Sequence, residues 1–200
     1  STLAARASTT EADQFLLQLP WDSQLRLSWQ QDSKAIYFRQ RSNKTQPYVL
    51  SRLELATRQV QQLTQPLSPD GDIALAISPD ASKLAVVSYL QQAKSRLRIY
   101  QREKMTLLAE QDVPFAVNAI SWQTDEQLLF GCAEQICRWD IETAVVQPLL
   151  HTGTTVESLH WQNGQLWYAT VQPKMAIWRQ PKPAPNTPWP SAEKQVASSR

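Results

Sequence analysis

Short apolar runs alternate with polar turns along most of this chain of 200 residues. Aromatic and β-branched residues recur in these runs, and such side chains favour the half-buried surface of a sheet. Long uninterrupted runs of Ala, Leu, Glu and Lys, which favour helices, are not a feature of the sequence. The pattern therefore predicts a mostly β protein built from many short strands.

One motif occurs four times: an apolar residue, then Ser or His, then Trp or Pro, then Gln or Asp, followed by a polar turn and an apolar strand. Its second positions, Ser28, Ser78, Ser121 and His160, are separated by 50, 43 and 39 residues, a mean of 44. Two further strands follow each copy of the motif. Their ranges are 48–55, 96–101, 135–141 and 174–179 for the third strands, and 59–63, 105–109, 145–150 and 194–197 for the fourth.

Four short strands in about 40 to 45 residues are typical of a β-propeller blade. A lone blade cannot bury both of its apolar faces, so we expect the blades to stack on one another. Ser68-Pro69-Asp70-Gly71 repeats the turn motif ten residues before Ser78. A strand after this earlier copy would run into Pro79, which cannot donate to a central ladder, so we interpret the earlier copy as an inserted loop.

These repeats divide the chain. We expect a leader or linker over 1–13 and a partial propeller over 14–200. The segment 14–19 occupies the place of an outer strand of a closing blade, and the whole is expected to be part of a larger ring of about six to eight blades. A closed four-bladed disc is the alternative. The four tandem, four-stranded blades are predicted at about 24–66, 72–112, 116–151 and 155–198.

Ile77-Ser78-Pro79-Asp80 and Arg138-Trp139-Asp140 resemble the TolB-like, WD-like repeats of bacterial propellers. The order of the segments, with blades directly after an Ala/Ser/Thr-rich start, is similar to the periplasmic sensor half of CadC/ToxR-type winged-helix transcriptional regulators. That resemblance implies a parent protein with a DNA-binding domain and a membrane helix outside this segment. It also implies a location on the periplasmic side of a bacterial inner membrane, with the cytoplasm as the alternative.

Charge and hydropathy narrow the class of partner. Twenty Lys and Arg against 18 Asp and Glu give a net charge of +2, with the basic residues scattered. Direct nucleic-acid contact by this segment is therefore disfavoured. No apolar run approaches the roughly 18 residues of a membrane helix, and the first residues carry no signal-peptide core. We expect the segment to be a piece of a longer protein whose parent is membrane-anchored.

Cys132 and Cys137, separated by four residues, are placed at a predicted hairpin between the second and third strands of the third blade. A tight hairpin can bring them to disulfide distance in an oxidising compartment. In a reducing compartment they would be two small buried apolar side chains. Two Cys without further ligands do not make the usual zinc site, so we expect no metal.

The two histidines, His151 and His160, have no Gly-x-Ser-x-Gly turn, zinc-protease motif or phosphate loop beside them. We expect no catalytic residue and no cofactor; His160 reads as structural and His151 as a loop residue. Arg39, Arg41 and Lys44 are placed in a basic loop that either faces an anionic ligand or is simply solvated.

Trp29, Trp122 and Trp161 recur at one position of the repeat. They could stack on a ligand at a rim, but their equivalence favours packing between blades. By strand alternation, Trp139, Trp167 and Trp178 are predicted to be core residues. Trp21, Trp189 and the proline-rich segment 181–190 are predicted in loops.

The sequence thus predicts a non-catalytic sensor or protein-interaction propeller, the module of a membrane-tethered regulator, which holds a protein or small ligand on one face. Two other classes remain open. One is the propeller domain of an oligopeptidase-type serine hydrolase, and the other is a TolB-like envelope scaffold.

Overall fold

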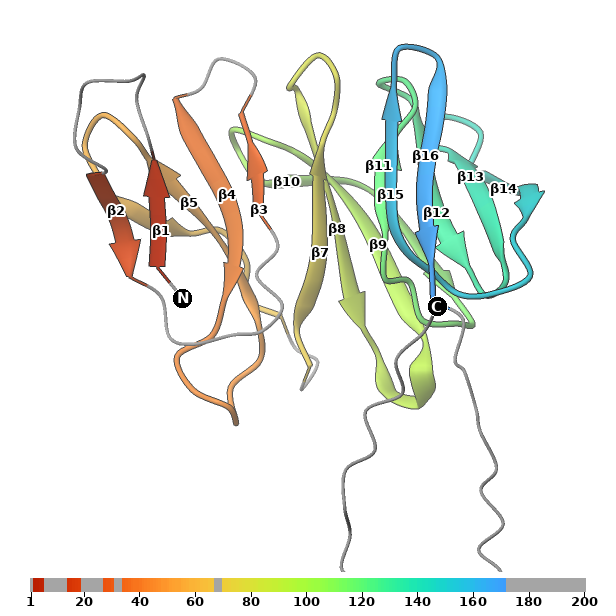
Figure 1. The fold of residues 1–200 in the computed structure, drawn as a ribbon, viewed down its shortest axis with the longest axis horizontal. Helices are drawn as coiled ribbons and strands as arrows, with labels where there is room; N and C mark the ends of the chain where they lie inside the picture. Colours follow the sequence, from red (N-terminus) through yellow and green to blue (C-terminus); the bar gives the residue numbers. More distant parts are fainter. Residues whose placement is uncertain (1, 6–13, 19–26, 31–33, 67–69, 172–200) are drawn as a thin grey trace, which may run out of the picture.

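The computed structural model describes residues 2–5, 14–18, 27–30, 34–66 and 70–171, and these residues form a series of small antiparallel sheets. The only helical segment in this part of the chain is a single 3₁₀ turn, η1 (Gln91–Ala93). Figure 1 shows the three four-stranded sheets side by side in chain order, with the N-terminal hairpin at one end and the C-terminal hairpin next to the third sheet. The predicted all-β propeller class is confirmed.

Three sheets have four strands each, in an order that follows the chain. The first comprises β3 (Leu27–Trp29), β4 (Ala35–Gln40), β5 (Val49–Glu54) and β6 (Val60–Gln62). The second comprises β7 (Asp72–Ile77), β8 (Lys83–Tyr89), β9 (Ser95–Gln101) and β10 (Thr106–Val113). The third comprises β11 (Ile120–Trp122), β12 (Gln127–Cys132), β13 (Gln135–Asp140) and β14 (Val145–His151).

The fourth unit is described by its first hairpin, β15 (Val156–Gln162) and β16 (Gln165–Thr170). Asn163 and Gly164 connect the two strands, and both have a positive φ, 52° and 76°. Asn-Gly is the residue pair that a tight hairpin turn of this kind favours. The strands predicted at 174–179 and 194–197 lie outside the described residues, as do Trp178 and the proline-rich segment.

The N-terminal region contains a further pair of strands. Thr2–Ala5 form strand β1, which pairs with β2 (Gln14–Gln18) in a separate two-stranded sheet. β1 lies within the range 1–13 that was predicted as a leader or linker, and its four residues have no alternating pattern that would reveal a strand. Figure 1 places this hairpin beside the first four-stranded sheet.

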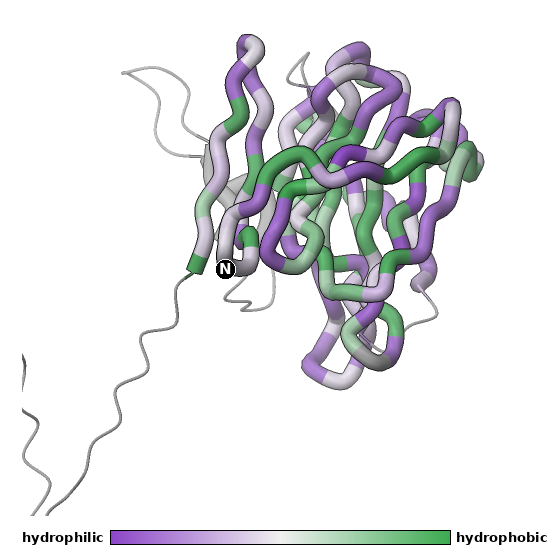
Figure 2. Tube along the Cα trace, turned by 90° about the vertical axis from the view of Figure 1, so that its right-hand side faces the viewer, coloured by the Kyte–Doolittle hydropathy of each residue, from purple (hydrophilic) through white to green (hydrophobic). Residues whose placement is uncertain are grey.

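The hydrophobic core lies between neighbouring sheets. Tyr37 and Leu50 of the first sheet pack with Leu84 and Val86 of the second. The largest cluster joins the second and third sheets, and a smaller cluster around Val156 joins the third and fourth. In Figure 2, hydrophobic segments run through the stacked sheets, whereas many of the loops are hydrophilic. Each sheet thus covers the apolar face of the next, as the repeat pattern requires.

Candidate functional site

The first strand of each unit forms the edge of its own sheet, and the four edges face one groove. β3, β7, β11 and β15, together with residues directly before or after them, contribute all of its lining, and its volume is about 710 Å³. Adjacent first strands are in contact, from β3 to β7, from β7 to β11 and from β11 to β15. The groove therefore follows the inner side of the row of sheets, where a propeller has its central channel.

The four repeat positions meet in this groove. Ser28, Ser121 and His160 are in β3, β11 and β15, and Ser78 directly follows β7. All four are among the lining residues. The register of the repeat that was read from the sequence thus brings equivalent residues to one site.

Two of these positions are used by the fold itself. The Ser78 hydroxyl donates to Asp80 Oδ1 at 2.6 Å and accepts from the backbone N–H of Lys83 at 2.9 Å. These bonds close the turn after β7, and the hydrogen bonds that Asp80 accepts hold its carboxyl pKa well below the ordinary value. Ser121 Oγ accepts the backbone N–H of Trp161 at 3.0 Å, which ties the third unit to the fourth.

The tryptophans at the repeated position differ in burial. Trp122 is 4% exposed, and its indole N–H donates to the carbonyl oxygen of Ala76 in the preceding unit at 3.0 Å. Trp161 is half-buried, and Trp29 is 48% exposed. The expectation of packing between blades is met by Trp122. It is wrong for Trp29. Trp122 packs against β7, the first strand of the preceding unit, whereas the described residues include no such strand before β3.

Other groups in the groove are not engaged. Within the described part of the chain, the side chains of Ser28, His160 and Gln162 make no hydrogen bond, and both His160 and Gln162 are exposed. By contrast, Asn118 is held between neighbours: its amide oxygen accepts from the Tyr89 hydroxyl and its amide nitrogen donates to Glu157 at 3.2 Å.

The groove carries almost no charge. Its lining includes no Asp, Glu, Lys or Arg, and His160 is its one titratable side chain. Across the described ranges, no group of three or more His, Cys, Asp or Glu residues is arranged to hold a metal ion. Nor does this part of the chain contain a helix long and apolar enough to cross a bilayer.

Cys132 and Cys137 are bonded in the structure, with Cα atoms 5.8 Å apart. They lie diagonally across the hairpin of β12 and β13, in which Cys132 is opposite Gln135 and Cys137 is opposite Phe130. Both are buried in the core between the second and third sheets. The pair is therefore structural and lies outside the groove lining.

The prediction of a basic loop over Arg39, Arg41 and Lys44 is wrong for Arg39. Arg39 belongs to β4, opposite Leu50, and is only 4% exposed, so it does not face a ligand. Its guanidinium donates to the carbonyl oxygen of Ile73 at 3.0 Å and lies 4.4 Å from the ring centre of Tyr48. Arg41 stacks on the same ring at 4.4 Å, and Lys44 is exposed. None of the three lines the groove.

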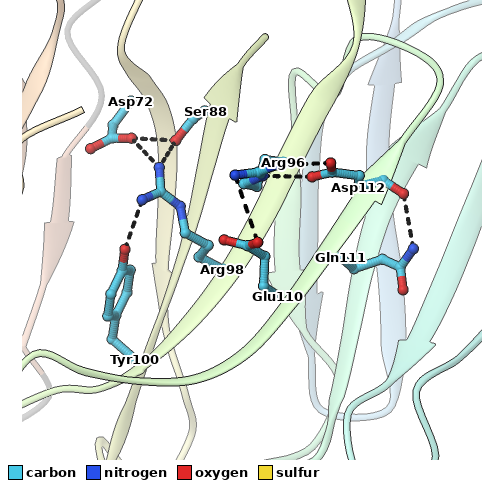
Figure 3. A network of polar contacts seen from close by, with 8 residues as sticks. All are labelled: Asp72, Ser88, Arg96, Arg98, Tyr100, Glu110, Gln111 and Asp112. Carbon is cyan, nitrogen blue, oxygen red and sulfur yellow. Dashed lines mark hydrogen bonds and ion pairs between the residues drawn. The ribbon is translucent and has the colours of Figure 1, made fainter. Parts of the chain in front are cut away.

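Sequence reasoning missed a polar network in the second sheet (Figure 3). Asp72 is fully buried and accepts from the Ser88 hydroxyl, while Arg98 contacts Asp72 at 3.4 Å, Ser88 at 2.5 Å and the Tyr100 hydroxyl at 3.0 Å. Burial raises the pKa of Asp72, against the opposing effect of its hydrogen bonds and of Arg98. The alternation of side chains along β8 and β9 could have revealed this network. Ser88 lies on the same side of β8 as Leu84 and Val86, and Arg98 on the same side of β9 as Tyr100, the side that packs against the first sheet.

A second cluster in Figure 3 is nearer to solvent. Arg96 donates two hydrogen bonds to the Asp112 carboxylate, at 2.6 and 2.9 Å, and lies 3.6 Å from Glu110. The bonds from Arg96 lower the pKa of Asp112. Both clusters hold strands together and lie away from the groove.

The predictions for the remaining tryptophans are confirmed in one case and wrong in another. Trp139 is 1% exposed and is a core residue, as predicted. Trp167 is 61% exposed, so its prediction as a core residue is wrong: within the described residues, no sheet covers that face of β16. His151 ends β14 and is exposed.

Solved structures similar to this chain include a β-propeller domain and a chain of a protein complex. One is a chain of a nidogen/laminin complex, with a TM-score of 0.66 and 9% identity over 84% of this chain and 64% of that one. TolB from Acinetobacter baumannii has a TM-score of 0.61 and 19% identity over 80% and 41%. The propeller domain of the trilobed protease from Pyrococcus furiosus has a TM-score of 0.59 and 13% identity over 84% and 56%.

The fold is that of a TolB-like, WD-like β-propeller. This chain spans between 41% and 64% of the length of those three structures. No protein-family model matches it, and no curated protein does.

Proposed function

We propose that this chain is a non-catalytic recognition module whose binding site is the groove between β3, β7, β11 and β15. The observation that carries the proposal is the convergence of four edge strands, with side chains that the fold does not use, on one open site. Rigid strands on either side keep such a site preformed, which lowers the entropic cost of binding.

The chemistry of the groove supports binding rather than catalysis. General base catalysis requires a group of suitable pKa that a second residue orients beside a nucleophile. His160 is the single candidate in the groove lining, and that lining contains no carboxylate or thiol to accompany it. The likeness to a chain of a nidogen/laminin complex supports a role in recognition.

The parent, in this proposal, is a membrane-tethered regulator of the CadC/ToxR type, and the module acts as its sensor on the periplasmic side of a bacterial inner membrane. The cytoplasm is the alternative location. Binding in the groove would bias a DNA-binding domain on the other side of the membrane, and the module itself would not contact nucleic acid. The support is the order of the segments, with blades after an Ala/Ser/Thr-rich start, and the near-neutral net charge of +2.

The test of this assignment is an alkaline phosphatase fusion to the module in the full-length parent, combined with a transcription reporter. We expect phosphatase activity outside the cytoplasm, and loss of signal response when Trp29 and His160 are replaced together by Ala. A parent gene without a winged helix and a membrane helix would contradict the regulator assignment.

An enzyme-associated role is the second candidate, and the likeness to the propeller domain of the trilobed protease favours it. In that case the module would control access to a separate catalytic domain of a serine hydrolase. A Gly-x-Ser-x-Gly segment elsewhere in the parent, together with peptidase activity, would decide for it. A TolB-like envelope scaffold would instead bind envelope proteins and leave transcription unchanged.

A further inference from the structure

The groove is lined by twenty residues, and none of them is Asp, Glu, Lys or Arg. A charged ligand that entered it would lose hydration without meeting an opposite charge, which is strongly unfavourable. Nearby charges are already engaged, since Glu157 accepts from Asn118 and Lys83 pairs with Glu126 at 2.5 Å. The ligand that this surface accommodates best is therefore uncharged.

The unused polar groups of the groove include a hydroxyl, an imidazole and an amide. Ser28 in β3, and His160 and Gln162 in β15, make no hydrogen bond to another described residue. These groups both donate and accept, so they match ligand hydroxyls, which also do both. A ligand with many hydroxyls and no charge satisfies them all.

Two tryptophans supply flat apolar surface at the two ends of the row of inner strands. Trp29 is 48% exposed and Trp161 is half-buried, whereas the equivalent Trp122 is covered by the second unit. Between them, the lining includes small side chains, such as Ala76 in β7 and Ala119 directly before β11. A sugar ring has an apolar face of C–H groups that stacks on an indole, and its rim carries hydroxyls.

From this arrangement we propose that the groove binds a short uncharged oligosaccharide. Trp29 and Trp161 stack on sugar rings, and Ser28, His160 and Gln162 bond their hydroxyls. The volume of about 710 Å³ lies in the range of sites for ligands larger than a single sugar. The inference rests on the proposed function, since it takes the groove as the recognition site and names its ligand class.

The experiment is isothermal titration calorimetry of the protein with cellohexaose, chitohexaose and maltohexaose. Heparin-derived oligosaccharide serves as a charged probe, and a neutral Gly/Ser/Gln-rich peptide serves as an uncharged one without sugar rings. We expect at least one uncharged oligosaccharide to bind, and the charged probe and the peptide not to bind. Trp29→Ala and Trp161→Ala should each weaken the binding by roughly tenfold.

Trp167→Ala is the matched control, because Trp167 is 61% exposed and lies outside the groove lining. It should leave the dissociation constant unchanged, and thermal unfolding of each variant shows whether it is folded. The proposal is overturned if no uncharged oligosaccharide binds, if the charged probe binds as tightly, or if Trp167→Ala weakens binding as much as Trp29→Ala.

Binding of the peptide alone, lost in Trp29→Ala, would overturn the oligosaccharide and leave the recognition function standing. The transcription reporter tests the groove itself. If the parent responds to its signal equally with and without the Trp29 and His160 side chains, the groove is not the recognition site. The two proposals therefore fail in distinguishable ways.

Discussion

The indole N–H of Trp122 in the third unit donates to the carbonyl oxygen of Ala76 in the second unit, across 3.0 Å. Ala76 lies in the edge strand β7, opposite Ala85 in the ladder between β7 and β8. The bond gives the buried indole N–H an acceptor in the neighbouring unit, and it fixes the position of one blade against the next.

Removing this side chain should weaken the contact between the blades. We expect Trp122→Ala to lower the free energy of unfolding by about 3 to 5 kcal/mol, since the indole is almost fully buried. Trp122→Phe keeps most of the apolar contact and should lose about 1 kcal/mol with the hydrogen bond. Urea denaturation followed by circular dichroism measures both.

Trp29→Ala is the control at the equivalent position. Because Trp29 is 48% exposed, its removal should reduce the stability of this chain by no more than about 1 kcal/mol. Equal losses for Trp29→Ala and Trp122→Ala would contradict the assigned contact.

The connection between the first and second units depends on a glycine. Gly71 has a φ of +75°, and a Cβ at this position would overlap the backbone nitrogen and oxygen of Tyr48. The backbone N–H of Asp72 also donates to the Tyr48 carbonyl at 2.9 Å. We expect Gly71→Ala to cost about 3 kcal/mol or more, because backbone cannot move aside as a flexible side chain can.

Gly164 serves as the comparison for Gly71, because a substitution there is strained by the positive φ alone and not by steric overlap. Its φ is +76°, but nothing lies within 4 Å of the position that a Cβ would take. Gly164→Ala should therefore cost only about 1 to 2 kcal/mol, the strain of the left-handed conformation. If the two substitutions shift the thermal midpoint equally, the close approach at Tyr48 is wrong.

The repeat was visible in the sequence because every blade must solve the same packing problem. Ser28, Ser78, Ser121 and His160 keep their places relative to the turn, so their convergence could be predicted from spacing alone. Trp139 was also predictable, since it lies on the alternating apolar face of β13.

The sequence did not reveal features that depend on which sheets are adjacent or on where each strand ends. Trp29 and Trp167 have strand patterns typical of buried positions, but burial requires a sheet on the correct side. Arg39 read as a loop residue because β4 continues to Gln40, beyond its apolar residues. The charge-free lining of the groove became visible only once residues from four strands were brought together.

The bond between Cys132 and Cys137 can be tested directly. Under denaturing conditions without reductant, thiol titration should find no free thiol, and after reduction it should find both cysteines. Reduction should lower the free energy of unfolding by about 2 kcal/mol, because the closed loop is short. Cys132→Ala with Cys137→Ala should make stability insensitive to reductant. Two reactive thiols in the oxidised protein would contradict the bond.

Asp72 should give the protein a distinctive dependence on pH. Because burial raises the pKa of Asp72 in the folded state, the folded protein binds this proton more tightly than the unfolded chain does. The contribution of Asp72 to stability should therefore rise as the pH falls from above its raised pKa toward the ordinary value of 3.8, and it should be lost in the opposite direction. The lowered pKa values of Asp80, Asp112 and Asp140 act with the opposite sign, so the raw profile mixes both effects.

The difference in unfolding free energy between the natural protein and Asp72→Asn isolates this group, since Asn does not titrate. Urea denaturation at a series of pH values should show this difference growing in favour of the natural protein on acidification. Asp112→Asn is the control and should show the reverse, because Arg96 stabilises the Asp112 carboxylate and acid removes that stabilisation. A flat difference for Asp72→Asn would mean that the carboxyl group is hydrated or fully compensated by Arg98, and that the buried network in the second sheet is wrongly described.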